Sequence, residues 1–293
     1  MMIEKFLNYL EFEQNRSELT VKNYGEDLKA FESFFKNLDD HLSWESIDSD
    51  IIRDWMESMM DKGNNATSVN RRLSALRSFY RFALAHQLVQ KDPAHGIVGP
   101  KKSKPLPQFL KEKEVDELLS PEMWNDTYED VCSRTIIMTF YETGLRLSEL
   151  VGLDDSSVNF INHELKVTGK RNKQRIIPFG EELEKTLRDF MTYRDEHLDK
   201  KCQALFLDKK GERIKKEKVR SEVKKNLSRV CTLKKRSPHV LRHTFATAML
   251  NHHAGLESLK RLLGHASLST TEIYTHTTFE QLKRVYNDAH PRA

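Results

Sequence analysis

The stretch SPHVLRHTFATAMLNHHAGLESLKRLLGHASLSTTEIYTHTTFE, residues 237–280, holds an arginine, several histidines and a tyrosine at fixed intervals. The set comprises His239, Arg242, His243, His265 and Tyr274. Apolar residues recur between them at helical spacing, which predicts helices over 239–250, 256–263 and 270–276. A segment of this kind could form a metal site, a phosphate site or an ordinary exposed helix surface.

The residues around the histidines argue against a metal site. His239 and His243 are one helical turn apart, as in HExxH zinc helices, but Val240 stands where that motif has its glutamate. Arg242 would also place a permanent cation beside the ion. The three cysteines form no CxxC pair, and no GxSxG nucleophile motif is present. We therefore expect no metal, no cofactor and no serine or cysteine nucleophile.

A phosphate site explains the combination best. Arginine presents a planar, permanently charged fork, tyrosine supplies a hydroxyl nucleophile, and histidine moves protons near neutral pH. A second arginine, Arg146, follows Gly144 in TGLRLSELVGL, at a helix start where a cation is unfavourable against the helix dipole. Lys170, at the tip of a predicted hairpin, is a third candidate cation. Because the sequence has no P-loop and no convincing carboxylate metal motif, it indicates a metal-free reaction on a phosphodiester.

The length of 293 residues predicts two domains. Residues 1–91 have the periodicity of a helical domain, and residues 92–108 hold four of the eight prolines, which predicts a linker to a second domain over 109–293. Residues 1–100 carry 12 Lys/Arg against 16 Asp/Glu, whereas residues 201–250 carry 15 against 4. The basic segment indicates a surface for a polyanion, with a solvated face as the alternative.

One helix of the first domain, predicted over 67–88, has two unlike faces. Its apolar face comprises Val69, Leu73, Leu76, Tyr80 and Leu84. Its other face carries Arg71, Arg77 and Arg81 among small polar residues that permit close approach to a DNA groove. We assign these arginines to DNA contacts, together with Lys101 and Lys102 of the linker; an ordinary amphipathic helix is the alternative.

The second domain has a mixed pattern. A buried helix is predicted over 127–143, followed by a hairpin with strands at 165–168 and 175–177. Further helices are predicted at 181–194, 215–230 and 279–288. The expected fold class is mainly α with a small β component. The longest apolar runs fall short of the ~18 residues of a membrane span, and the acidic, amphipathic start is unlike a signal peptide, so we expect a cytoplasmic protein without membrane association.

Several motifs in register make the chain resemble the tyrosine recombinase (phage integrase-like) family, and within it the Xer type. The motifs span nearly the whole length and read TGLRLSEL, VTGKRNKQRIIP, HVLRHTFAT, LLGHASLSTTEIYTH and AHPRA. The resemblance implies an N-terminal helical core-binding domain and an α+β catalytic domain that together clamp duplex DNA at a short recombination site. It also implies cutting and rejoining of DNA through a 3′-phosphotyrosyl intermediate, independent of metal and ATP.

The resemblance implies a role for each residue of the phosphate site. Tyr274 is the expected nucleophile, while Arg146 and Arg242 hold the scissile phosphate. His265 is expected to stabilise the transition state and His239 to assist proton handling. Lys170 is expected to protonate the departing 5′ oxygen.

One residue departs from the pattern. Arg171 follows Lys170 where relatives commonly have glycine. The assignment of Lys170 stands, whereas the reach of the hairpin is left open. We expect Arg171 to contact a neighbouring phosphate.

The C-terminal tail, 279–293, has Leu282, Val285 and Tyr286 at helical spacing. In the family such a tail docks into a neighbouring protomer. We therefore expect exchange of tails in a homo- or hetero-tetramer, with a paralogous recombinase as a possible partner. A tail folded back on its own domain is the alternative.

Xer-type resolution of chromosome dimers during cell division is the expected role. A mobile-element integrase would share the chemistry, whereas a non-catalytic DNA-binding regulator or a type IB topoisomerase would not exchange strands at a site. The two-domain organisation without a further arm-binding domain favours the Xer type. The sequence leaves open the target site and the choice between the XerC and XerD types.

Overall fold

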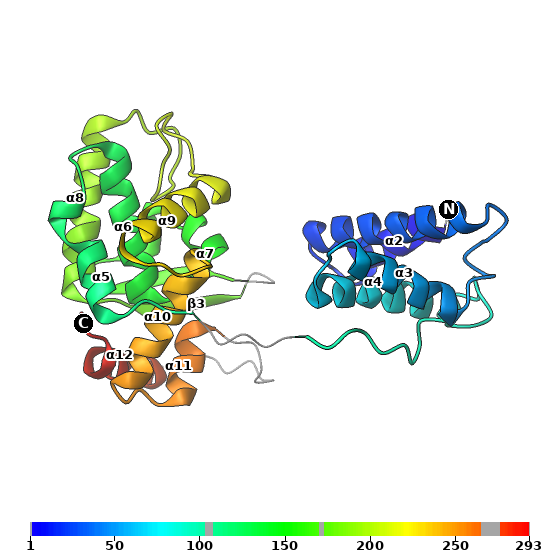
Figure 1. Ribbon diagram of the computed structural model, residues 1–293. Coiled ribbons are helices and arrows are strands. Elements are labelled where there is room, and N and C mark those ends of the chain that lie inside the picture. The colour runs from blue at the N-terminus through cyan, green and yellow to red at the C-terminus, as the bar shows by residue number, and fades with distance from the viewer. Residues whose placement is uncertain (1, 103–107, 170–172, 265–275, 293) are drawn as a thin grey trace. The chain divides into compact units, whose positions relative to one another are not determined.

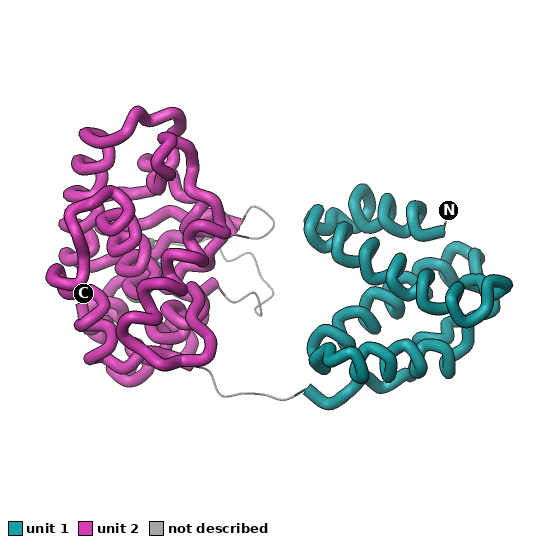
Figure 2. Tube along the Cα trace, turned by 45° about the horizontal axis from the view of Figure 1, so that its top comes forward, with its two compact units in different colours: residues 1–105 teal, residues 106–293 magenta. Residues whose placement is uncertain are grey.

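The computed structural model describes residues 2–102, 108–169, 173–264 and 276–292, with backbone alone over 276–282. The chain divides into two compact units, Met1–Pro105 and Leu106–Ala293 (Figure 2). The fold is mainly helical with one small sheet (Figure 1), so the predicted fold class is confirmed. Over the described ranges, every helix is too short or too polar to cross a bilayer.

The first unit is a bundle of helices. Its elements are α1 (Met2–Asn8), the π-helical turn η1 (Tyr9–Glu13), α2 (Glu18–Leu38), α3 (Ser49–Asp61) and α4 (Ala66–Ala85). Side-chain caps begin the three long helices: the Ser17 hydroxyl accepts from Thr20 N, and Asp48 and Asn65 act in the same way before α3 and α4. These caps fix where each helix begins.

Aromatic side chains fill the core of the first unit. Phe31, Trp44 and Phe79 are buried and pack with ring centroids 4.4–5.7 Å apart. On α4 the predicted apolar face is buried as expected, except that Leu84 is 43% exposed. Phe79 and Ala83 are buried in addition, because the helix packs on α1 as well as on α2 and α3.

The segment predicted as a linker begins as part of the first unit. Ala94 and Ile97 are buried in the first unit's core. Arg77 Nη2 donates to Ile97 O, and Asn70 Nδ2 donates to Pro100 O at 2.8 Å. The chain is therefore anchored to α4 as far as Pro100, and Lys101 and Lys102 follow with exposed side chains.

The second unit is built around one buried helix, α6 (Tyr128–Thr143). Its other long helices are α8 (Glu181–His197), α9 (Lys216–Val230), α10 (Pro238–Asn251) and α12 (His276–Ala289). The shorter elements are α5 (Glu112–Leu119), η2 (Pro121–Met123), α7 (Leu147–Val151), η3 (Asp155–Ser157) and α11 (Leu256–Leu263). Helix α6 packs against α8, α9 and α10 and is buried over almost all of 132–143. It is the predicted buried helix at 127–143.

A three-stranded antiparallel sheet flanks this core. The strands β1 (Val158–Asn159), β2 (Glu164–Thr168) and β3 (Gln174–Pro178) lie in chain order. The β2–β3 pairing runs from Glu164 opposite Pro178 to Thr168 opposite Gln174, which confirms the predicted hairpin. Strand β1 is too short to give a sequence pattern, and it was not predicted.

The C-terminal helix α12 packs on its own unit, which is the alternative considered for the tail. Tyr286 is fully buried, and its hydroxyl lies 3.3 Å from Glu142 Oε2 on α6. His290 stacks on Tyr286 with a centroid separation of 5.0 Å. Lys283 Nζ donates to Asn162 O at 2.9 Å, and Arg292 pairs with acidic side chains of α5 and α8.

Candidate active site: an arginine cluster on helix ends

Arg146 projects from a tight turn between α6 and α7. Gly144 ends α6 in the left-handed region at φ +59°, and a Cβ atom there would lie 2.5 Å from Phe245 Cδ1. Only glycine satisfies both the backbone angle and the close packing. The predicted turn at Gly144 is therefore present, and it sets the direction of Arg146.

The Arg146 guanidinium is held at two points. Nη1 donates to Glu149 Oε1 and Nη2 donates to Gly264 O, each at 2.9 Å. The Arg146 backbone N–H also donates to Glu149 Oε2 at 2.8 Å. The Arg146 side chain remains 32% exposed, so it is fixed in direction and still accessible to a ligand.

Arg242 reaches the same place from α10. It is buried, and it donates to Gly144 O and, at 2.6 Å, to Leu263 O. Burial, followed by the positive charge of Arg146, lowers the pKa of Arg242 to about 10. Arg242 is still cationic at neutral pH, although the nearby charge of Arg146 repels it.

A third arginine, Arg175 on β3, completes the cluster. Its Nη1 and Nη2 donate to the two oxygens of Glu149 at 2.6 and 2.9 Å, and its Nε donates to Leu262 O at 3.2 Å. Burial alone would raise the pKa of Glu149, but hydrogen bonds from Arg175 and Arg146 lower it to about 2. Glu149 is therefore a permanent carboxylate with donors on both oxygens.

The sequence interpretation assigned no role to Glu149 and Arg175. A signal was present for each. Arg175 shares the inward face of β3 with Ile177, where alternation places a charged residue among apolar ones. Glu149 lies three residues after Arg146, the spacing of a carboxylate that reaches back to a helix start.

The balance of charge in this cluster favours an anion. Arg146 and Arg175 both pair with one carboxylate, Glu149, whose charge also acts on Arg242. Their remaining described acceptors are main-chain carbonyls at the C-terminal ends of α6 and α11, which are neutral groups with a partial negative charge. The arginines are thus held in place without being neutralised, and a phosphate would offset their mutual repulsion.

His239 lies on the same α10 face as Arg242, three residues earlier. Its side chain is exposed. Loss of solvation, then the charges of His243, Arg242 and Arg146, lower its pKa below the usual 6.5. A neutral imidazole at physiological pH can accept a proton or a hydrogen bond from a bound ligand.

Four predicted site residues lie outside the described residues: Lys170, Arg171, His265 and Tyr274. The described residues that precede two of them reach the arginine cluster. Gly264, just before His265, accepts from Arg146. A Cβ placed on Gly169, just before Lys170, would lie 3.6 Å from Glu149 Oε1. The last described residue before His265 and the last one before Lys170 therefore both lie beside the arginine cluster.

Two of the three arginines predicted to contact DNA from α4 make internal contacts. Arg71 pairs through both Nη atoms with Asp27, and Arg77 donates to the main chain at Ala94 and Ile97. Arg81 is exposed. Arg71 is also 45% exposed, so α4 keeps basic side chains at its surface although part of its charge is used in the fold.

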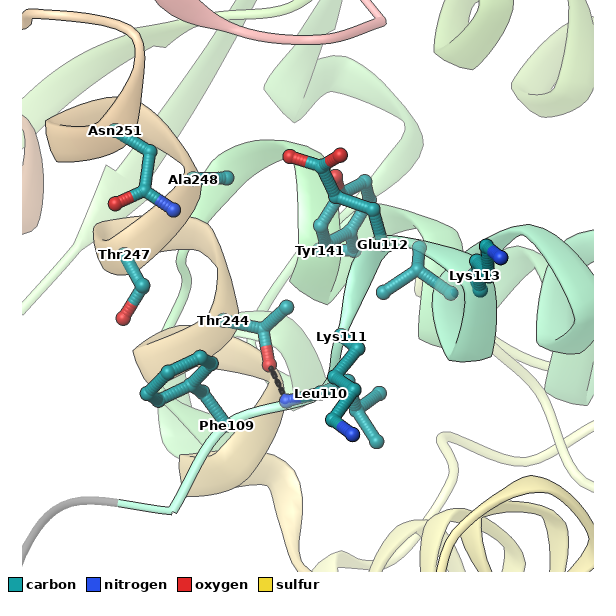
Figure 3. Close-up of a pocket in the computed structure, with 11 residues that line it drawn as sticks. Phe109, Leu110, Lys111, Glu112, Lys113, Tyr141, Thr244, Thr247, Ala248 and Asn251 are labelled. Carbon is teal, nitrogen blue, oxygen red and sulfur yellow. Dashed lines mark hydrogen bonds between the residues drawn. The ribbon is translucent and has the colours of Figure 1, made fainter.

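A separate hollow of about 390 Å³ lies on another face of α10 (Figure 3). Thr244, Thr247 and Ala248 line it from α10, facing Phe109 and Leu110 on the chain entering α5. Leu110 N donates to Thr244 Oγ1 at 3.0 Å. The lining is mainly apolar, and the contact fixes the start of the second unit on α10.

Comparison with known proteins identifies both units. Residues 108–281 match the model of the phage integrase family, and residues 3–87 match the phage integrase N-terminal SAM-like domain. The chain is 35% identical to tyrosine recombinase XerC of Chlorobaculum tepidum, covering 99% of this chain and 94% of the relative. It is 34% identical to tyrosine recombinase XerD of Oceanobacillus iheyensis, covering 99% and 98%.

Solved structures share the fold. The XerH site-specific recombinase, in a post-cleavage complex with its palindromic difH substrate, gives a TM-score of 0.72 at 22% identity and covers 96% of this chain and 83% of its own. The Tn1549 transposon integrase in complex with transposon right end DNA gives 0.74 at 18%, with 97% and 98% covered. From these matches over both units, the chain belongs to the phage integrase family of tyrosine recombinases.

Proposed function

We propose that this protein is a site-specific DNA recombinase that uses Tyr274 as its nucleophile and the arginine cluster to hold the scissile phosphate. The observation that carries the proposal is the convergence of three arginines: Arg146 and Arg175 pair with Glu149, and Arg242 donates to main-chain carbonyls at the ends of α6 and α11 beside them. A phosphodiester is the anion that a tyrosine recombinase must bind at this point.

The reaction exchanges one phosphodiester for another. Tyr274 Oη attacks phosphorus, a 3′-phosphotyrosyl bond forms, and the 5′ oxygen leaves with a proton from Lys170. A 5′ hydroxyl of the partner duplex then attacks the phosphotyrosyl bond and frees Tyr274. The number of phosphoester bonds is unchanged, so no nucleotide triphosphate is consumed.

The residues of the cluster act on the charge that develops at phosphorus. The transition state is a pentacoordinate phosphorane with more negative charge than the bound diester. Arg146 and Arg242 donate to its non-bridging oxygens, with His265 as a further donor. One preorganised donor in such a site is worth about 3–4 kcal/mol. His239, whose pKa is lowered first by loss of solvation and then by its charged neighbours, takes the proton from Tyr274.

The biological role we propose is Xer-type resolution of chromosome dimers. Relatives named XerC and XerD match this chain almost equally, which supports the role and leaves the type open. Two duplexes and four active sites are needed for a complete exchange. We propose a tetramer, alone or with a paralogous recombinase, in which α12 can leave its own unit for a neighbour.

The proposal is tested by trapping the covalent intermediate in cells. Tagged wild-type and Tyr274→Phe proteins are expressed, denatured in SDS and captured, and the attached DNA is sequenced. Tyr193→Phe is the matched control, because Tyr193 lies on α8 and is partly exposed.

Enrichment of one short site with wild type and Tyr193→Phe, but not with Tyr274→Phe, is the expected result. Recovery of scattered sites from many genomic positions would instead favour a mobile-element integrase. Background recovery from all three proteins, with and without the co-expressed paralogue, would contradict a catalytic role.

A further inference from the structure

Arg175 is a cation at a buried strand position, where proteins usually have an apolar residue. Its side chain is 8% exposed, and it lies on the face of β3 that points into the unit. A buried charge is tolerated only when it is paired and hydrogen-bonded. Arg175 meets this condition: its Nη atoms donate to Glu149 and its Nε donates to Leu262 O.

The Arg175–Glu149 pair contacts several parts of the site at once. The Glu149 carboxylate orients Arg146 because it accepts hydrogen bonds from both the guanidinium and the backbone N–H of Arg146. A Cβ on Gly264 would lie 3.1 Å from Arg175 Cζ, so the chain that leads to His265 passes directly against the guanidinium. A Cβ on Gly169 would lie 3.6 Å from Glu149 Oε1 and 3.9 Å from Arg175 Nη1, which places the chain leading to Lys170 there as well.

The geometry of this contact requires arginine. Two parallel bonds to the Glu149 carboxylate prevent it from rotating, and the third bond fixes the end of α11. A lysine would supply charge as a single point and could not make all three bonds. Without the fork, Glu149 can turn, and Arg146 loses its fixed direction.

We infer that Arg175 is a positioning residue for strand cleavage, which holds Glu149 and, through it, the Arg146 guanidinium in place for the scissile phosphate. The inference rests on the proposed function. Arg175 touches no reacting atom in this account. Its substitution should therefore slow the chemical step while leaving the affinity for DNA nearly unchanged.

The test measures single-turnover cleavage by Arg175→Lys on a duplex carrying the site recovered by covalent capture. A nick beside the scissile phosphate lets the 5′ product depart, so that the adduct accumulates. The matched control is Arg194→Lys, because Arg194 on α8 is also fully buried and also forks onto a carboxylate, Asp155, and onto main-chain carbonyls.

At saturating DNA we expect Arg175→Lys to cleave about 30- to 100-fold more slowly than wild type, and Arg194→Lys to stay within about threefold. DNA dissociation constants should agree within about threefold for all three proteins. The double variant Arg175→Lys/Arg146→Lys should be no slower than Arg146→Lys alone, because both changes disable the same contact, that of the Arg146 guanidinium with the scissile phosphate.

A second substrate separates positioning from a general structural defect. A methylphosphonate at the scissile position carries no charge on its non-bridging oxygen. The rate of its cleavage therefore depends less on Arg146. The deficit of Arg175→Lys should shrink to less than about fivefold on this duplex, since the lost contact acts on that charge. A general folding defect would give the same deficit on both duplexes.

Several results would overturn the inference: equal deficits on the two substrates, an equal deficit in Arg194→Lys, or additive losses in the double variant. Failure of both Arg175→Lys and Arg175→Gln to fold, with Arg194→Lys folded, would also overturn it, since Arg175 would then serve the fold alone. Absence of any adduct with wild type is a distinct outcome, because it contradicts the proposed function and the inference with it.

Discussion

Both units use arginine side chains internally, but in different arrangements. In the first unit, Arg71 and Arg77 act separately along α4: one pairs with Asp27 and the other donates to the loop that follows the helix. In the second unit, arginines from three separate elements converge, and burial followed by the charge of Arg146 lowers the pKa of Arg242. Convergence of like charges destabilises a fold. It therefore indicates a site for an anion, whereas the arginines of α4 serve mainly to fix the helix and its loop.

The largest expected effect is on catalysis by Arg242. We expect Arg242→Gln to lower the single-turnover cleavage rate about 10²- to 10³-fold, because one preorganised donor to the phosphorane is lost. The matched change, Arg77→Gln, should leave cleavage at saturating DNA within about threefold and instead lower the stability by about 1–3 kcal/mol, since Ile97 O loses its buried donor. Equal effects of the two changes on cleavage would contradict the distinction between the arginine cluster of the second unit and the separate arginines of α4.

The next effect concerns acid stability, through His290 in the tail. Burial lowers the pKa of His290 from 6.5 to about 4, so the folded state favours the neutral ring. As pH falls from about 6.5 to about 4, the unfolded chain takes up a proton that the folded chain does not, and stability is lost by roughly 3 kcal/mol. His290→Phe should remove this loss.

Urea unfolding of wild type and His290→Phe at a series of pH values measures this effect. The difference between the two proteins isolates His290 from Glu142, whose buried carboxyl has a raised pKa and acts in the opposite direction. Parallel curves for the two proteins between pH 6.5 and 4 would show that His290 is not buried in the tail as described.

A smaller effect is expected from the glycines that end helices. Gly264 and Gly63 both have positive φ, at +63° and +79°, but a Cβ on Gly264 meets Arg175 while a Cβ on Gly63 meets nothing within 4 Å. Each change to alanine should lower stability by about 1–2 kcal/mol through backbone strain. Only Gly264→Ala should also slow cleavage, by about tenfold, because it presses on the guanidinium. Thermal unfolding and single-turnover assays together make the comparison.

The smallest effect is expected from the exposed lysines before the second unit. Lys101→Ala/Lys102→Ala should weaken DNA binding severalfold and lower the slope of log K against log salt by about 2, one for each lost phosphate contact. Cleavage at saturating DNA should not change. A salt slope equal to that of wild type would show that these two lysines do not contact DNA phosphates.

Much of the fold could be predicted from the sequence because local patterns dominate it. The buried helix at α6, the β2–β3 hairpin and the helices from α8 to α11 follow from periodicity and turn residues. Strand β1 and the π-helical turn η1 could not be predicted, since each is too short to carry a pattern. Leu84 was wrongly placed in the core: in the last turn of α4 the buried positions belong to Phe82 and Ala83, and Leu84 is 43% exposed.

Of the arginine cluster, the sequence pointed to two members but not to their contacts. Arg146 and Arg242 were identified by residue type and motif, and the structure brings both to the C-terminal end of α11. The acceptors that they reach there are main-chain carbonyls, which leave no mark in the sequence. Arg175 carried a signal, a charged residue at an inward strand position, whose meaning depends on Glu149 reaching it across the fold.

The most direct measurement of the central claim is the chemical identity of the covalent link. Purified protein is trapped on the nicked duplex and digested with trypsin, and the peptide spanning 262–283, in which Tyr274 is the single tyrosine, is sequenced by mass spectrometry. The account predicts a nucleotide joined through its 3′ phosphate to Tyr274 Oη. A link through a 5′ phosphate, a link to another residue, or an unmodified peptide from a cleaved sample would contradict it.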